Sequence, residues 1–163
     1  MFQIAIVEDE KSYRDLLESY LNQYAKEHFL EIHAVFFEDG DEIIESYKCE
    51  YDIILMDIMM QFMDGMTAAE TIRKQDEEVI IIFITNMINY AIKGYKVAAF
   101  DYILKPITYY ALEKSLDRAL VKVTERETRK YININVQGGI QKLALTEICY
   151  IESQAHYLTF YTQ

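Results

Sequence analysis

The stretch YDIILMDIMM, residues 51–60, decides how this chain folds. Its apolar run Ile53–Met56 is typical of a strand that is buried on both faces of a parallel sheet. Asp57 follows directly, and because an unpaired buried charge is costly, this carboxylate must lie at the mouth of the strand. Open α/β sheets bind ligands outside the carboxyl ends of their strands. The stretch therefore predicts a parallel sheet and a functional position for Asp57.

The rest of residues 1–123 alternates between strand-like and helix-like patterns. Five apolar runs predict strands, and the amphipathic segments that follow them predict five helices, including a modest one around Asn89–Gly94. This alternation indicates the α/β class, with a flavodoxin-like, doubly wound, five-stranded parallel sheet of order 2-1-3-4-5. The predicted strands are Phe2–Val7, Ile32–Phe37, Ile53–Met56, Val79–Ile84 and Ala99–Leu104.

The sequence changes character after residue 123. Residues 124–130 are polar and charged, which fits either the end of the last helix or a linker, and residues 131–163 contain only strand-like patterns. About 33 residues are too few for an independent β domain with its own core. We therefore expect a short C-terminal all-β segment, with strands at Tyr131–Val136, Ile140–Leu145, Ile148–Ile151 and Tyr157–Tyr161.

Composition and charge exclude several classes of protein. The net charge of −11 arises from residues 1–123, with 23 acidic and 12 basic side chains, whereas residues 124–163 hold four of each. Such an acidic first part argues against direct nucleic-acid binding there. The sequence lacks an apolar run of roughly 20 residues, a signal-peptide pattern and metal-site spacing of its cysteines. We expect a cytoplasmic protein with reduced thiols and no membrane partner.

Chemically active side chains follow four of the predicted strands. Strands one and three are neighbours in the expected order, so the carboxylates of Glu8, Asp9 and Asp57 should meet. Clustered carboxylates favour a hard cation, and Mg²⁺ is the natural cofactor for oxygen ligands. The Thr85 hydroxyl and the Lys105 ammonium, expected on the far side, suit a tetrahedral oxyanion. Together these groups describe a site that forms an aspartyl phosphate.

With these motifs, residues 1 to about 123 resemble a response-regulator receiver domain. The matching features are Glu8-Asp9, Met56-Asp57-Ile58 with Asp64-Gly65, Thr85, and Asp101-Tyr102-Ile103-Leu104-Lys105-Pro106. The resemblance implies a two-component response regulator in which Asp57 accepts a phosphoryl group from a sensor histidine kinase. It also implies that Mg²⁺ is bound by Asp9, Asp57 and the Met59 carbonyl, with Glu8 acting through water. Thr85 and Tyr102 would form a switch pair. Lys105 would contact the phosphate, and its bond to Pro106 is often cis in the family.

Residues 131–163 resemble the opening of a LytTR DNA-binding domain. The match rests on Glu147-Ile148-Cys149-Tyr150-Ile151-Glu152-Ser153 followed by His156-Tyr157. The resemblance implies a transcriptional output, with His156 near DNA bases. Promoter DNA is expected to bind the full-length regulator but not this chain, because Lys142 is the only basic residue of the segment. Its exposed strand edges predict a homodimer through residues 131–163, and Tyr90, Tyr95 and Tyr102 offer an alternative dimer face.

Two other functions compete with a signalling switch that is not an enzyme. A Mg²⁺-dependent phosphohydrolase with an Asp nucleophile needs an acid/base two residues further on, where this chain has Met59. A flavin or nucleotide binder needs a phosphate-binding loop after the first strand, where Asp9 and Glu10 would repel a phosphate.

Two positions depart from the receiver pattern. Gln61 replaces a common proline, which should leave the loop after Asp57 less rigid. Asn86 replaces a small residue, which should narrow the access of a phosphoryl group to the site.

Overall fold

The computed structural model describes residues 1–87, 97–129, 131–136, 139–154 and 157–162. The chain divides into two compact units, Met1–Ala119 and Leu120–Gln163. The helix expected around Asn89–Gly94 lies outside the described residues, as do Tyr90, Tyr95 and His156.

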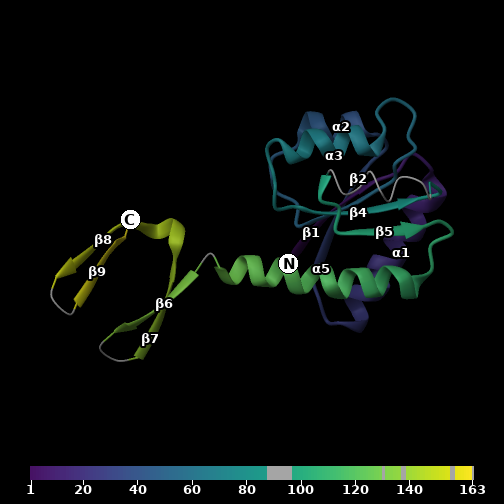
Figure 1. Cartoon of the computed structure of the whole chain (residues 1–163). Coiled ribbons are helices and arrows are strands. Elements are labelled where there is room, and N and C mark those ends of the chain that lie inside the picture. Colours follow the sequence, from purple (N-terminus) through teal and green to yellow (C-terminus); the bar gives the residue numbers. More distant parts are fainter. Residues whose placement is uncertain (88–96, 130, 137–138, 155–156, 163) are drawn as a thin grey trace. The chain divides into compact units, whose positions relative to one another are not determined.

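A five-stranded parallel sheet of order β2-β1-β3-β4-β5 forms the centre of the first unit. Helices α2 and α3 cover one of its faces, and α1 and α5 cover the other (Figure 1). This arrangement confirms the predicted fold class and strand order. The elements are β1 Phe2–Val7, α1 Lys11–Glu27, β2 Ile32–Phe37, α2 Gly40–Ser46, β3 Ile53–Met56, α3 Gly65–Arg73, β4 Ile80–Thr85, β5 Asp101–Leu104 and α5 Tyr109–Arg129.

The central strands explain why both faces need helices. Every residue of β3 and β4 is buried, so the apolar side chains of each strand require partners on both sides of the sheet. On α5, five apolar residues are buried, and burial of each leucine contributes about 1.5–3 kcal/mol. Hydroxyl groups then tie α1 to α5, because Tyr24 donates to Asp117 at 2.8 Å and Tyr109 donates to Glu27. The buried α5 residues are Leu112, Leu116, Ala119, Leu120 and Val123.

Element boundaries differ from the predicted ones for local reasons. Strand β4 begins at Ile80 rather than Val79, because the Val79 N–H is bonded to the Asp76 carboxylate in the preceding turn. Strand β5 begins at Asp101 rather than Ala99, because Ala98 adopts a left-handed backbone (φ 47°) that turns the chain just before it. Helix α5 continues to Arg129, so residues 124–129 are helical.

The second unit contains two antiparallel hairpins. Strands β6 Tyr131–Val136 and β7 Gly139–Ala144 form the first, and β8 Ile148–Gln154 and β9 Tyr157–Thr162 form the second. A single 3-10 turn, η3 Leu145–Glu147, joins them. The first hairpin was predicted to within one residue at each end, whereas β8 extends three residues beyond the predicted strand.

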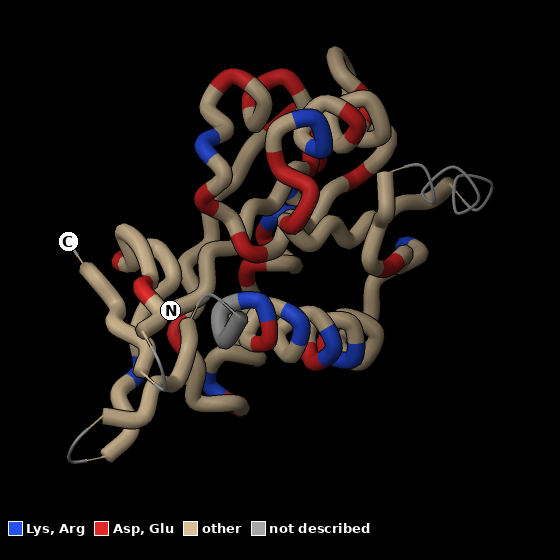
Figure 2. Tube along the Cα trace, turned by 60° about the vertical axis from the view of Figure 1, so that its left-hand side comes forward, with Lys and Arg blue, Asp and Glu red and all other residues tan. Residues whose placement is uncertain are grey.

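Charged side chains are distributed unevenly along the chain. Asp and Glu positions outnumber Lys and Arg positions over the first unit (Figure 2), as the sequence requires. Both cysteines are free and exposed. In the part of the chain that the structure describes, no helix is long and apolar enough to cross a membrane.

Candidate functional site

The predicted site residues lie together at one edge of the sheet. Val7 pairs with Met56 in the register of β1 and β3, so Glu8 and Asp57 follow on adjacent strands. The Asp57 N–H donates to the Val7 carbonyl at 2.9 Å, and the Lys105 N–H donates to the Thr85 carbonyl at 3.0 Å. Parallel pairing therefore carries the ends of β1, β3, β4 and β5 to the same place, as predicted.

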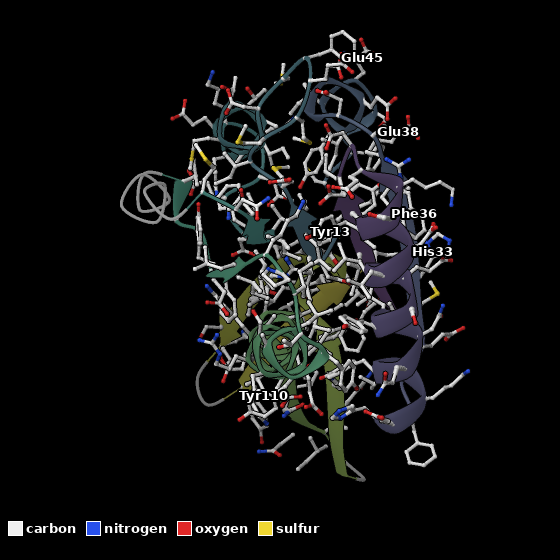
Figure 3. All side chains as sticks on the ribbon, turned by 90° about the vertical axis from the view of Figure 1, so that its right-hand side faces the viewer. Tyr13, His33, Phe36, Glu38, Glu45 and Tyr110 are labelled. Atoms are coloured by element: carbon white, nitrogen blue, oxygen red, sulfur yellow. The ribbon has the colours of Figure 1, made fainter. Side chains whose placement is uncertain are left out.

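Lys105 lies between two of the carboxylates. Its Nζ is 2.7 Å from Asp57 Oδ2 and 2.8 Å from Glu8 Oε2, and the three side chains are only 3%, 6% and 1% exposed, respectively. The expectation that Lys105 would stand on the far side from the carboxylates is therefore wrong. A buried ammonium is costly unless it is paired, and here two carboxylates meet that need. The ring of Tyr13, which extends from α1 toward the sheet in Figure 3, lies 4.0 Å from Nζ and adds a cation–π contact.

Burial and charge shift the ionisation of this group. Burial raises the pKa of Glu8, and the nearby Asp57 charge adds to the rise, while Lys105 opposes it. Burial acts to lower the pKa of Lys105, but hydrogen bonds and attraction to Asp57 and Glu8 outweigh it and raise that pKa. Lys105 is therefore held as an ammonium, whereas Glu8 takes up a proton more readily than an ordinary glutamate.

The Asp57 carboxylate is fixed from both sides. Its Oδ1 accepts the N–H groups of Ile58 (2.5 Å) and Met59 (3.1 Å), while Oδ2 accepts from Lys105 (2.7 Å). The first residue of α3 must be glycine here, because a Cβ on Gly65 would lie 2.0 Å from the Asp57 carbonyl oxygen. Asp57 thus has a defined orientation at the strand mouth.

The donor set of this edge fits a divalent cation. Glu8, Asp9 and Asp57 each offer a carboxylate oxygen, and these atoms lie within 4.8 Å of one another. Lys105 pairs with two of these three acidic side chains, and the closeness of like-charged groups disfavours the cluster unless a cation joins it. All-oxygen ligands suit Mg²⁺. Arg14 shapes the acidic turn by donating to the carbonyls of Glu8 (2.6 Å) and Asp9 (2.9 Å).

The two predicted switch residues are connected through Met87. Thr85 is fully buried, and its Oγ1 accepts the Met87 N–H at 3.3 Å. The Tyr102 hydroxyl donates to the Met87 carbonyl at 2.5 Å, and its ring lies 6.0 Å from that of Phe83. Met87, two residues beyond the end of β4, therefore links the Thr85 side chain to the Tyr102 side chain.

Three residues around the site were not identified from the sequence. Tyr13 and Arg14 lie in the first turn of α1, and Asp39 follows β2. The sequence carries a signal for Asp39, because β2 ends at the same edge of the sheet as the other strands and this carboxylate comes two residues later. Tyr13 and Arg14 gave no comparable signal, because an aromatic and a basic residue at the start of a helix are common on any surface.

Comparisons with known proteins agree with this geometry. The family model described as response regulator receiver domain matches residues 4–117. The chain belongs to the response regulator receiver family. Similar proteins include the sensory transduction protein LytT of Oceanobacillus iheyensis, which is 32% identical over 131 residues, covering 78% of this chain and 51% of LytT. The transcriptional regulatory protein NatR of Bacillus subtilis is 29% identical over 168 residues, covering 99% of this chain and 68% of NatR.

Solved receiver structures resemble the first unit. The response regulatory domain of protein mrkE from Klebsiella pneumoniae has a TM-score of 0.69 and 26% identity, covering 76% of this chain and 99% of that one. TrrA from Thermotoga maritima, solved in complex with Mg²⁺–BeF, has a TM-score of 0.63 and 26% identity, covering 73% of this chain and 99% of that one. The family makes this receiver a signalling protein rather than a classical enzyme, and a phosphohydrolase is not favoured.

The relatives are longer than this receiver-containing chain, which spans about half the length of several of them. The matches to LytT and to LytR of Staphylococcus saprophyticus are consistent with a receiver followed by a LytTR-type segment, as the resemblance of residues 131–163 implied.

Proposed function

We propose that Asp57 accepts a phosphoryl group from a sensor histidine kinase in a Mg²⁺-dependent reaction, and that this controls a transcriptional output. One observation carries the proposal. Asp57 is a buried strand-end carboxylate that is oriented by the Ile58 and Met59 amides, paired with Lys105, and grouped with the acidic residues Glu8 and Asp9. A carboxylate used only to cap a helix would not need a buried ammonium and two further carboxylates.

In this reaction an Asp57 carboxylate oxygen attacks the phosphorus of a phosphohistidine. The new O–P bond forms as the P–N bond breaks, and the electron pair of that bond returns to the histidine nitrogen. Lys105 then faces an acyl phosphate in place of a free carboxylate, so its ammonium is available to the phosphoryl oxygens. Asp9, Asp57 and the Met59 carbonyl would hold Mg²⁺, with Glu8 acting through water, and the bound ion would supply positive charge against the phosphoryl oxygens.

Thr85 and Tyr102 are the proposed switch residues. The Thr85 hydroxyl can donate to a phosphoryl oxygen, and a rotation toward Asp57 would change the contact that it accepts from Met87. Tyr102 is bonded to the carbonyl of the same Met87. A change at Thr85 therefore has a direct route through one backbone unit to an aromatic side chain on β5.

Transcription control is proposed for the full-length regulator. LytT and NatR are named as a sensory transduction protein and a transcriptional regulatory protein, respectively. This chain by itself is not expected to bind promoter DNA. Lys142, the one basic residue of 131–163, lies with its Nζ 4.4 Å from the Tyr131 ring, and His156 alone cannot hold a protein in register on a duplex.

We also propose that the chain forms a homodimer through its two hairpins. Each hairpin of the second unit is a two-stranded sheet, so its outer edges offer unpaired backbone groups. Large apolar side chains such as Ile140 (74% exposed) and Tyr157 (78%) accompany these edges. Strand addition between two copies would satisfy both the edges and the apolar side chains.

Acetyl phosphate with Mg²⁺, followed by intact-mass measurement, tests the phosphoryl-acceptor assignment. The wild-type chain should gain the mass of one phosphoryl group, and Asp57→Asn should gain none. Asp52→Asn is the matched control, because Asp52 precedes the same strand at its other end. Equal labelling of Asp57→Asn and the wild type would refute the role of Asp57.

A further inference from the structure

Asp39 is a buried carboxylate that the proposed phosphoryl chemistry does not use. It follows β2, caps the N-terminus of α2 and is 4% exposed. Its Oδ1 accepts the N–H groups of Gly40 (2.7 Å) and Met63 (2.7 Å), and its Oδ2 accepts the N–H of Phe62 (2.8 Å). Two of these three N–H groups belong to the loop that follows Asp57.

Backbone contact reinforces these hydrogen bonds. A Cβ on Gly40 would lie 2.7 Å from the Met63 carbonyl oxygen, so the turn after β2 meets the loop backbone to backbone. The loop is thus held at both ends. Asp57 Oδ1 holds the amides of Ile58 and Met59, and Asp39 holds those of Phe62 and Met63.

The charge of Asp39 is stabilised by the backbone. Among the salt bridges of the described residues, none includes Asp39. Burial acts to raise its pKa, but backbone N–H groups of Phe62, Met63, Gly40 and Asp41 outweigh burial and lower it. An ionised carboxylate whose donors lie on the loop binds that loop more strongly than a neutral side chain could.

We propose that Asp39 is a positioning residue for the phosphoryl-acceptor site, fixing the 58–63 loop so that the Met59 carbonyl can serve Mg²⁺. The proposal rests on the proposed function, because that function makes the loop part of the cation site. It also accounts for Gln61. Glutamine does not restrict the backbone as a proline would, and here the constraint comes from the hydrogen bonds of a carboxylate on a neighbouring turn.

Magnesium affinity, measured by calorimetry on the 163-residue chain, tests the proposal. Residues that orient metal ligands typically change affinity by 10–100-fold, so Asp39→Ala should weaken Mg²⁺ binding about tenfold. Asp39→Asn keeps one acceptor oxygen and should fall between Asp39→Ala and the wild type. Hydrogen exchange of the Phe62 and Met63 amides should become faster in Asp39→Ala.

Asp76→Ala is the matched control for loss of a structural carboxylate. Asp76 also accepts two backbone N–H groups, from Glu78 and Val79 at 2.9 Å each, and the Tyr47 hydroxyl at 2.8 Å, but it precedes β4 at the opposite edge of the sheet. Asp76→Ala should lower the melting temperature and leave the Mg²⁺ affinity unchanged.

The role of Asp39 is overturned by wild-type affinity in Asp39→Ala, or by an equal loss of affinity in Asp76→Ala. Absence of Mg²⁺ binding by the wild-type chain would overturn it as well. A wild-type chain that binds Mg²⁺ but gains no phosphoryl group refutes the proposed function, and the affinities of the Asp39 and Asp76 variants still decide whether Asp39 positions the loop.

Discussion

Replacing Lys105 by methionine should destabilise the first unit strongly. Lys105→Met keeps most of the side-chain volume but removes the ammonium that lies 2.7 Å from Asp57 Oδ2 and 2.8 Å from Glu8 Oε2. Both carboxylates are at most 6% exposed, so they cannot recover the interaction from water. Removing one partner of a buried ion pair costs about 3–5 kcal/mol. At about 2–4 °C per kcal/mol for a chain of this size, the melting temperature should fall by about 6–20 °C.

Thermal unfolding followed by circular dichroism, without Mg²⁺, measures this loss of stability. Repeating the measurement at several pH values tests whether the missing ammonium beside Glu8 causes it. The folded state already binds a proton at Glu8 more tightly than the unfolded state does, because burial raises the pKa of Glu8. Loss of the ammonium should raise that pKa further. The deficit of Lys105→Met relative to the wild type should therefore shrink between about pH 7 and about pH 5. A loss below about 1 kcal/mol, typical of exposed pairs, or a deficit independent of pH would refute this reasoning.

Three further outcomes are expected. Millimolar Mg²⁺ should raise the melting temperature, because a ligand at a concentration of a hundred times its dissociation constant adds about 2.7 kcal/mol to the free energy of unfolding. The rise should be smaller in Asp9→Ala, and equal rises in the two proteins would count against a cation at Asp9. Phosphorylated Met59→Asn should lose its phosphoryl group faster than the wild type in a mass-spectrometric time course, because asparagine orients an attacking water better than methionine; an unchanged or slower rate contradicts this. Light scattering should find a dimer for residues 1–163 but not for a chain ending at Arg129; a dimer of equal stability in the shorter chain would exclude the hairpins as its cause.

The fold could be predicted because its signals are local. Strands β3 and β4 are uninterrupted apolar runs, and only a sheet covered on both faces buries such runs completely. The meeting of Glu8, Asp9 and Asp57 also followed from topology, because strand order alone brings their strand ends together. The errors at the starts of β4 and β5 came from turn geometry at Asp76 and Ala98, which strand propensity does not report.

The finer structure of the site depends on contacts to backbone groups, and even where the position of a side chain could be predicted, these partners could not. Asp39 bonds to amides 23 and 24 residues away, and every residue except proline carries such an amide. Arg14 likewise binds the carbonyls of Glu8 and Asp9, which reveal nothing in the sequence about their partner. Side-chain identity and strand order predict the carboxylate cluster, but the pairing of Lys105 with two of its members and the choice of backbone partners appear only in the folded structure.

Lys105 and a bound cation would each supply positive charge to the carboxylates of this site. Without a cation, the ammonium is the positive charge that Glu8 and Asp57 share, and its burial is favourable only because both carboxylates are there. Magnesium bound to Asp9 and Asp57 would supply that charge instead and leave the ammonium available to an incoming phosphoryl group. The stability deficit of Lys105→Met should consequently narrow in Mg²⁺, whereas its phosphorylation by acetyl phosphate should stay impaired. The two responses should differ because Mg²⁺ would replace the charge of Lys105 in the resting site but not the hydrogen bonds that we propose Lys105 makes to the phosphoryl oxygens.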